Sequence, residues 1–264
     1  LILVLGTIFF LANKKGAVAV IKNFRPAQLI YHGGLFFAGA GLGLLAYPQN
    51  MQLNLFSSLA VVILLLSIFF AWKSSVIVND LYYFGIDEIT NNNRPLQKNI
   101  FANNEYTGLG IIFFFLSLLG GLVISVKFAL LLFMYQILAW FYSAPPYRLK
   151  RFPIIATFFS ALASILILII GFNLFSGDDN MRMFPWRIIG LLIIALTLSL
   201  GIKDFKDIEG DRRYGVMTIP VIFGDQAGRM IVGSGIFLSF ILSVFILNER
   251  SLFWPALISG GAAF

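Results

Sequence analysis

The sequence predicts an all-α, polytopic transmembrane helix bundle, and three observations carry this prediction. Hydrophobic residues make up 59% of the chain and charged residues only 12%, with a mean hydropathy of +0.90. Soluble domains contain roughly 45–50% apolar and about 25% charged residues. Phenylalanine alone occurs 29 times, and long apolar runs recur along the whole chain. Such a chain cannot cover itself with polar surface, so its solvent is lipid.

The apolar runs have the length of membrane-spanning helices. A helix needs about 20 residues to cross a hydrocarbon core roughly 30 Å thick. By that criterion the chain contains spans at 27–47, 55–78, 106–124, 127–143, 153–175, 186–202 and 229–247, and a further one that starts near 252 and is cut off at the last residue. We expect residues 13–264 to form one transmembrane domain with an incomplete C-terminal end.

Residues 1–12 form an apolar segment of their own. We interpret them as the tail of a preceding transmembrane or N-terminal segment. A signal peptide is the alternative, but no basic segment precedes these residues and no small-residue cleavage site follows them.

Proline and glycine mark the starts and the contacts of the spans. Pro26, Pro153 and Pro185 open three of them, at positions where the missing N–H of proline leaves no helical hydrogen bond unmade. The first span also carries glycines at positions 33, 34, 39, 41 and 43. A small-residue face of this kind is typical of close helix–helix packing in membranes.

The charged residues orient the bundle. Of the 19 lysines and arginines, 15 fall in the N-terminal stretch or near the loops after the second, fourth and sixth spans. The four exceptions are Lys127, Arg182, Arg187 and Arg250. This bias predicts that the basic face lies in the cytoplasm. Nine of the 12 acidic residues share that face, the exceptions being Asp178, Asp179 and Glu249. Because topology alone requires no carboxylates there, the mixture indicates a site for a metal and a polyanion.

The composition also excludes several classes of site. The chain has no cysteine, which rules out disulfides, thiolate metal sites and cysteine nucleophiles. His32 is the only histidine, so a zinc site or a Ser-His-Asp triad is implausible. The chain has a net charge of +7, and the basic residues gathered at one face of the membrane account for it. We therefore expect no nucleic-acid partner and no obligate protein partner.

The first acidic motif closes the second span. Asn79 and Asp80 are followed by Asp87. If the helix continues, Asp80 and Asp87 lie seven residues apart on one face, with the neutral oxygen of Asn79 beside them. An oxygen-rich stripe of this kind suits Mg²⁺, which keeps waters and shares ligands with substrate phosphates.

The second acidic motif closes the sixth span. Asp204, Asp207 and Asp211 stand at i, i+3 and i+7, which again makes one helical stripe. Either motif alone can be an ordinary solvated helix end. Two motifs at matching helix ends on one face favour a functional site, because ionisable groups at a membrane boundary are functional candidates. We expect two Mg²⁺ ions, and we expect the catalytic residues to be Asp80, Asp87, Asp207 and Asp211.

Basic residues stand close to both acidic motifs. Arg94 follows the first motif, Lys203 opens the second, and Lys150 and Arg151 follow the fourth span. An arginine fork and a lysine point charge suit phosphate oxygens, so these side chains are candidates for binding a diphosphate. The alternative is that they only anchor the loops at the cytoplasmic face.

Four motifs, taken in order, resemble the UbiA superfamily of intramembrane prenyltransferases. They are Asn-Asp…Asp from position 79, Arg-Pro-Leu from 94, Tyr-Ser-x-Pro-Pro-x-x-Leu-Lys-Arg from 142, and Lys-Asp-x-x-Asp-x-Glu-Gly-Asp-x-x-x-Gly from 203. The resemblance runs from Arg25 to the seventh span. It implies a bundle of about eight to nine transmembrane helices with a polar cap over a central cavity.

The resemblance also implies roles for individual residues. Asn79, Asp80 and Asp87 would bind one magnesium ion. Asp204, Asp207 and Asp211 would bind another. The residues expected to contact the diphosphate are Arg94, Lys150 and Arg151.

Two positions depart from the family pattern. Tyr83 stands where the first family motif carries a middle aspartate, which leaves the first metal with fewer carboxylate ligands. The tyrosine expected four residues before Lys150 is replaced by Pro146. Either Tyr142 or Tyr147 is then the candidate to take its place.

These observations predict magnesium-dependent transfer of an isoprenyl group from a polyprenyl diphosphate to a hydrophobic acceptor, either aromatic or a lipid phosphate, at the cytoplasmic face of the bilayer. Two alternatives come from other classes. A CDP-alcohol phosphotransferase would carry a compact D-G-x-x-A-R…G-x-x-x-D…D run, which is absent here. A membrane transporter would place charges or broken helices near the midplane, whereas Ile111–Leu119 and Ile188–Leu200 carry no charge.

Overall fold

A computed structural model describes residues 2–23, 25–50, 54–176 and 183–264, and all regular structure in these ranges is helical. The helices before the second acidic motif are α1 (Ile2–Ala12), α2 (Lys14–Lys22), α3 (Pro26–Ala46), η1 (Pro48–Asn50), α4 (Leu55–Tyr82), α5 (Phe84–Thr90), α6 (Asn103–Ile124), α7 (Val126–Ser143), η2 (Leu149–Arg151), α8 (Pro153–Ser176) and α9 (Trp186–Ser199). The remaining helices are η3 (Leu200–Asp207), α10 (Ile208–Arg213), α11 (Ile219–Phe223), α12 (Asp225–Leu247), η4 (Arg250–Leu252) and α13 (Phe253–Ala263).

The predicted membrane spans are confirmed. Within the described ranges, seven helical segments are long and apolar enough to cross a bilayer, and each covers one of the seven predicted full spans. The sixth continues from α9 through η3 to the end of α10, at Arg213. The expected further span corresponds to α13. Three charges assigned to the opposite face, Asp178, Asp179 and Arg182, lie outside the described residues.

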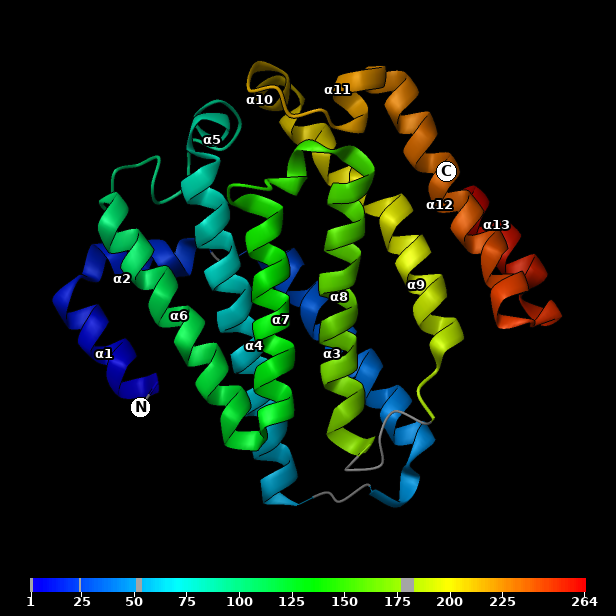
Figure 1. The fold of residues 1–264 in the computed structure, drawn as a ribbon, viewed down its shortest axis with the longest axis horizontal. Coiled ribbons are helices and arrows are strands. Elements are labelled where there is room, and N and C mark those ends of the chain that lie inside the picture. The colour runs from blue at the N-terminus through cyan, green and yellow to red at the C-terminus, as the bar shows by residue number, and fades with distance from the viewer. Residues whose placement is uncertain (1, 24, 51–53, 177–182) are drawn as a thin grey trace.

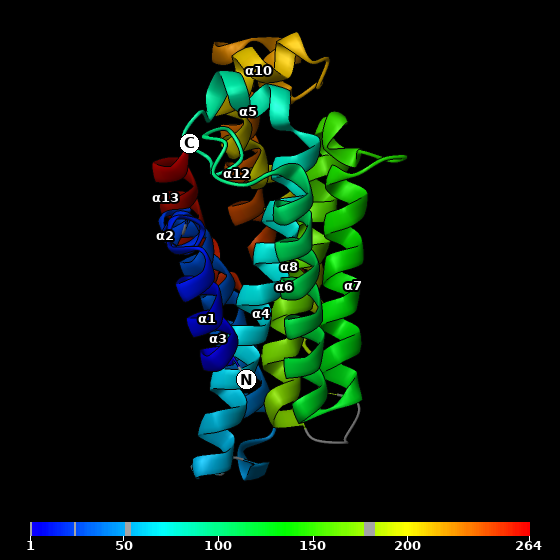
Figure 2. The same ribbon diagram turned by 90° about the vertical axis from the view of Figure 1, so that its left-hand side faces the viewer.

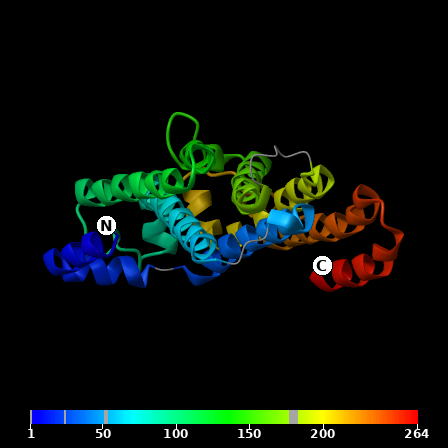
Figure 3. The same cartoon turned by 90° about the horizontal axis from the view of Figure 1, so that it is seen from below.

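The long helices form the body of the bundle, and the short ones cap one end of it. Helices α5, α10 and α11 gather at the same end in two perpendicular views (Figures 1 and 2). Seen from below, α1–α2 and α12–α13 lie at opposite ends of the long axis, with the other helices between them (Figure 3). Because the acidic motifs lie in or next to α5 and α10, the arrangement gathers them over one end of the bundle.

Helices α3 and α8 pack closely against each other at glycines. A Cβ atom on Gly39 would lie 1.9 Å from the Leu168 carbonyl oxygen, and one on Gly171 would lie 2.0 Å from the Phe36 carbonyl oxygen. Only glycine permits this approach, which confirms the predicted small-residue packing at Gly39. A Cβ atom added to the glycines at positions 33, 34 and 41 would meet nothing within 4 Å, so these glycines do not contribute to this contact.

The apolar surface is divided between core and exterior. Phe36 and Leu64 are fully buried in a cluster to which α3, α4, α7 and α8 all contribute. Leu45 and Phe56 are 81% and 80% exposed. Exposure of this kind is costly in water, where each large apolar side chain gains roughly 1.5–3 kcal/mol from burial, but it carries no such cost in hydrocarbon.

Candidate active site

A helix break at Tyr83 separates the two carboxylates of the first acidic motif. Helix α4 ends one residue before Tyr83, and α5 begins one residue after it. Asp80 therefore lies on α4 and Asp87 on α5, which corrects the expectation of one continuous helical stripe. Both side chains are nevertheless buried, with exposed fractions of 1% and 3%.

Arginine holds the two carboxylates together. Arg94 Nη1 donates to Asp80 Oδ1 at 2.7 Å and also pairs with Asp87 Oδ2. Asp80 receives two further hydrogen bonds, from Arg25 Nη2 at 3.1 Å and from the Tyr106 hydroxyl at 3.1 Å. This network compensates the burial of Asp80, since a buried charge is tolerated only when it is paired and hydrogen-bonded.

The ionisation of the Asp87 carboxyl depends on its burial and on the charges next to it. Burial raises the pKa of Asp87 to about 6, and the charges of Arg94 and Lys150 oppose the rise. Burial likewise raises the pKa of the neighbouring Tyr83 hydroxyl. An added cation would favour the ionised carboxylate, so the first motif remains responsive to the charge that is bound next to it.

The second acidic motif runs across a change of helix type. Asp204 and Asp207 lie in the 3-10 segment η3, where residues three apart point the same way, and both line the cavity described below. Asp211 follows on α10 and is fully buried. Neither of its carboxylate oxygens accepts a hydrogen bond of normal geometry from the described residues. A buried carboxylate in this condition is a candidate cation ligand.

Asn91 joins the two acidic motifs. Its Nδ2 donates to Asp87 Oδ1 and to Asp207 Oδ1, both at 3.2 Å. The close approach of α10 to α5 depends on Gly210, because a Cβ there would lie 2.9 Å from Ile86 Cγ2. The two motifs, 116 residues apart at Asn91 and Asp207, therefore meet at one place.

A cavity of about 400 Å³ opens next to the motifs. Arg94, Lys150 and Lys203 all line it, as do Asn79 and Tyr142. Lys203 Nζ donates to the Tyr142 hydroxyl at 2.9 Å, and Lys150 Nζ lies 4.1 Å from the centre of the Tyr83 ring. The position where the family motif carries an aspartate thus holds a lysine by a cation–π contact.

Some sequence-predicted residues do not reach this cavity. Tyr147 is 56% exposed and packs against Phe141, and Arg151 is exposed. Neither lines the cavity, so Tyr142 is the better placed of the two candidate tyrosines.

Three site residues were missed by sequence reasoning. Arg25 and Tyr106 bind Asp80, and Asn91 bridges the motifs. Only Asn91 had a local signal, since it stands one helical turn after Asp87. The partners of Arg25 and Tyr106 are distant in the chain.

The residues present suit a hydrated divalent cation better at the second motif than at the first. Among the described residues, no three acidic or histidine side chains form a ready-made metal cage. Mg²⁺, however, usually takes only one or two carboxylates together with water and phosphate. At the second motif neither Asp211 oxygen accepts a hydrogen bond of normal geometry from the described residues. At the first motif Asp80 and Asp87 are already paired with Arg94.

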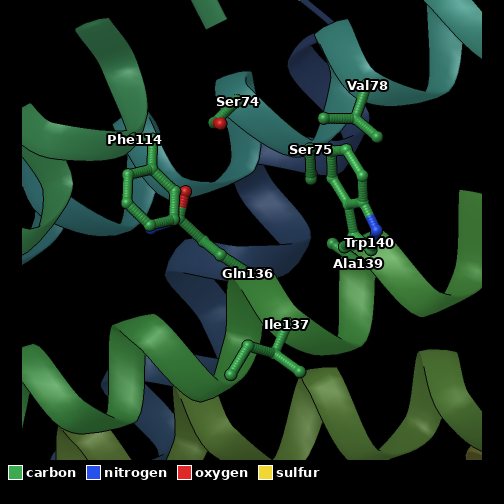
Figure 4. A pocket seen from close by; sticks show the side chains of 8 residues that line it. All are labelled: Ser74, Ser75, Val78, Phe114, Gln136, Ile137, Ala139 and Trp140. Atoms are coloured by element: carbon green, nitrogen blue, oxygen red, sulfur yellow. The ribbon is translucent and has the colours of Figure 1, made fainter. Parts of the chain in front are cut away.

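A second, smaller pocket of about 170 Å³ lies between α4, α6 and α7 (Figure 4). Ser75 and Ala139 line both this pocket and the larger cavity, so they form the wall between the two. Gln136 lines only the smaller pocket. Its side chain is buried, and neither amide atom has a hydrogen-bond partner among the described residues.

We expect the Gln136→Leu variant to be more stable than the native chain, by about 1 kcal/mol. A buried amide without a partner costs roughly 1–3 kcal/mol, and an apolar side chain of similar size removes that cost. The free energy of unfolding in detergent measures the effect. Ser74, whose hydroxyl bonds the Gly110 carbonyl in the same pocket, supplies the control: Ser74→Ala should not stabilise. A loss of stability in Gln136→Leu would contradict the prediction.

Sequence comparison places this chain among known prenyltransferases. A family described as the UbiA prenyltransferase family matches residues 27–264. Digeranylgeranylglyceryl phosphate synthase of Methanosphaera stadtmanae is 29% identical over 212 residues, covering 80% of this chain and 71% of that protein. The 2-acyl-4-prenylphloroglucinol 6-prenyltransferase of Humulus lupulus is 31% identical over 69% of this chain, but the match spans only 46% of that protein's length.

Structural comparison gives the same fold. A UbiA homolog from Archaeoglobus fulgidus, solved bound to GPP and Mg²⁺, superimposes with a TM-score of 0.72 and 22% identity. The match covers 92% of this chain and 86% of that one. A second structure of a UbiA homolog from that organism, bound to DMAPP and Mg²⁺, gives a TM-score of 0.70.

Proposed function

Because this chain belongs to the UbiA prenyltransferase family, and is therefore a multi-pass membrane prenyltransferase, we propose that it uses magnesium to transfer an isoprenyl group from a polyprenyl diphosphate to an aromatic or lipid-phosphate acceptor. The observation that carries the proposal is the junction of the two acidic motifs at Asn91, beside a cavity lined by Arg94, Lys150 and Lys203. Family membership decides against the transporter and CDP-alcohol phosphotransferase alternatives.

The basic residues bind the leaving group. Arg94, Lys150 and Lys203 present donors to the cavity next to the carboxylates. A bound diphosphate would lie between these basic side chains and the Mg²⁺ that the carboxylates hold. When bound, Mg²⁺ supplies a Lewis acid that neutralises the charge developing on the diphosphate. Of the two ions that we propose, one at each motif, the ion at Asp204, Asp207 and Asp211 has the better supported ligands.

The cavity walls protect the reactive carbon. Trp72, Tyr31 and Tyr135 line it together with aliphatic side chains. Apolar walls slow the entry of water, so that the acceptor captures the cation first, and the faces of aromatic rings attract a cation. An allylic carbocation formed by loss of diphosphate would be stabilised there until the acceptor attacks it.

Two classes of acceptor are supported by the two relatives described above. One is named for a glyceryl phosphate product and the other for a prenylated phloroglucinol. The identities with this chain are too similar, at 29% and 31%, to favour one class. An assay with both kinds of acceptor decides between them.

The purified protein should be incubated with radiolabelled geranylgeranyl diphosphate, with geranylgeranylglyceryl phosphate or homogentisate as acceptor. We expect diphosphate release that requires Mg²⁺ and a prenylated product with one of the acceptors, identified by mass spectrometry. Absence of Mg²⁺-dependent release with this donor and with longer polyprenyl diphosphates would contradict the proposed function.

We also propose that the motif face lies in the cytoplasm, as the basic residues indicate. Lys98 lies between α5 and α6 at the motif end, whereas Arg250 begins η4 and follows the end of α12 that lies away from α11. Both residues are exposed. Because the chain has no cysteine, Lys98→Cys and Arg250→Cys each introduce a unique thiol. In intact cells, a membrane-impermeant maleimide should label only the Arg250→Cys variant. Labelling of Lys98→Cys but not of Arg250→Cys would show that the motif face lies outside the cytoplasm.

A further inference from the structure

The only histidine of the chain lines the cavity, although the binding of the diphosphate makes no use of it. His32 lies on α3 on the same helical face as Arg25, which binds Asp80 at the motif end. Seven residues separate the two, which places His32 about 10 Å deeper along the helix at 1.5 Å per residue. This depth lies below the diphosphate site, toward the part of the cavity that the reacting carbon and the acceptor would share.

The surroundings of His32 fix which ring nitrogen carries the proton. Nδ1 lies 2.7 Å from the carbonyl oxygen of Gln28. A carbonyl oxygen can only accept, so Nδ1 carries the hydrogen. In the neutral ring the lone pair is then on Nε2, which lies 3.3 Å from the Tyr135 hydroxyl. Tyr135 also lines the cavity, so the basic nitrogen faces a group on the cavity wall.

Neighbouring side chains hold the imidazole in this orientation. The Gln28 side-chain oxygen accepts from Trp72 Nε1 at 3.2 Å, which fixes the helical turn that anchors His32. The rings of Tyr31, Trp72 and Tyr135 surround it, with centroids 5.5 to 6.1 Å away. A base positioned beside aromatic rings suits a step in which a carbocation is captured and a proton is released.

We propose that His32 Nε2 is the base that takes the proton lost by the acceptor during prenyl transfer, an inference that rests on the proposed function. The bond between the acceptor's nucleophilic atom and C1 of the prenyl group forms, and the bond between C1 and the diphosphate oxygen breaks with its electron pair leaving on the diphosphate. The proton from the acceptor's hydroxyl, or from the attacked ring carbon of an aromatic acceptor, goes to the Tyr135 hydroxyl as that hydroxyl passes its own proton to Nε2. No further reactant is needed.

A purely structural histidine is the competing explanation, and the two differ in what they predict for ionisation and transfer. The carboxylates and basic residues that assist departure of the diphosphate lie at the motif end, away from His32. Loss of the base should therefore slow transfer to the acceptor while diphosphate release continues, because water can capture the cation instead. A structural defect would lower release and transfer together.

The test measures both quantities in one assay with radiolabelled geranylgeranyl diphosphate and the acceptor that is active in the wild-type chain. We expect His32→Phe and His32→Gln to keep Mg²⁺-dependent diphosphate release. The ratio of prenylated acceptor to released diphosphate should fall about a hundredfold, the order contributed by a general base, with geranylgeraniol formed in place of the product. In His32→Ala, added imidazole should restore part of the transfer.

Gln136→Leu is the matched control, since it also replaces a buried polar side chain but lies on the smaller pocket, next to Tyr135 in the chain. Its product-to-diphosphate ratio should equal that of the wild type. An unchanged ratio in both His32→Phe and His32→Gln would overturn the assignment, and so would a parallel loss of release and transfer. If His32→Phe does not fold, His32→Gln decides, because its amide retains a donor for the Gln28 carbonyl. Failure of release in the wild-type chain would instead contradict the proposed function.

Discussion

Replacing Asp211 with asparagine is expected to lower kcat/KM by about a thousandfold, the order of effect seen when one strong electrostatic contact to a developing charge is lost. Asp211 is fully buried, and within the described residues neither of its carboxylate oxygens accepts a hydrogen bond of normal geometry, although Lys150 and the Thr218 hydroxyl are near enough to attract its charge. Asparagine keeps the shape of the side chain but removes the charge that attracts a divalent cation. Transfer of radiolabelled prenyl groups over a range of Mg²⁺ concentrations measures the effect.

The same substitution should leave the protein at least as stable as before. A buried carboxylate whose oxygens accept no well-formed hydrogen bond opposes folding. The neutral amide removes that unfavourable contribution, which the attraction of Lys150 offsets only in part. Loss of activity together with unchanged or increased stability would identify Asp211 as a residue kept for its chemistry. Asp225→Asn supplies the control, because Asp225 is exposed and its one ion pair among the described residues is with Arg229, one turn away at 3.0 Å. Full activity in Asp211→Asn would remove this residue from the site.

Asp80→Ala is expected to destabilise the protein by about 3–5 kcal/mol, the range for a buried ion pair that loses one partner. The side chain of Asp80 is fully buried and accepts hydrogen bonds from Arg25, Arg94 and Tyr106. Its removal leaves Arg25 without the carboxylate that it binds, and leaves Arg94 with Asp87 as its carboxylate partner. Activity should fall as well, since Arg94 would be held at the cavity wall by Asp87 without the support of Asp80. The free energy of unfolding in detergent measures the first effect.

A double-mutant cycle separates the interaction from general damage. If Asp80 and Arg94 stabilise each other, the loss in Asp80→Ala/Arg94→Ala should be smaller than the sum of the two single losses, by about 0.5–3 kcal/mol for residues in direct contact. Additive losses would show that the 2.7 Å contact contributes little. Arg148→Ala provides the comparison. Arg148 is a basic residue close to the same motif, but it donates to the Tyr82 carbonyl and, in the part of the chain that the structure describes, to no carboxylate.

The family departure at Tyr83 illustrates how a sequence can locate a change without explaining it. The sequence shows a tyrosine in place of an expected aspartate, which predicts a weaker first metal site. The structure shows that Tyr83 lies in the break between α4 and α5. The centre of its ring is 4.1 Å from Lys150 Nζ. Whether a side chain at this position faces a metal or a lysine depends on the distant segment that carries Lys150. No local sequence pattern reveals that contact.

The sequence by itself determined the membrane spans and the chemical classes of the two motifs. Both are local properties: about 20 consecutive apolar residues suffice to define a span, and carboxylates three, four or seven residues apart define a stripe wherever the helix lies. The candidate residues Asn79, Asp80, Asp87, Asp204, Asp207 and Asp211 could be identified in this way, but the stripe rule failed for Asp80 and Asp87, which lie on two helices.

Only the tertiary structure decided which of these groups meet and which remain unpaired. Arg25 reaches Asp80 across 55 residues of chain, and Asn91 reaches Asp207 across 116. The break at Tyr83, the unpaired Asp211 and the orientation of His32 toward Tyr135 likewise depend on packing between separate helices. Such contacts are fixed by the shape of the whole bundle, and a helix end of the same composition would carry different partners in another fold.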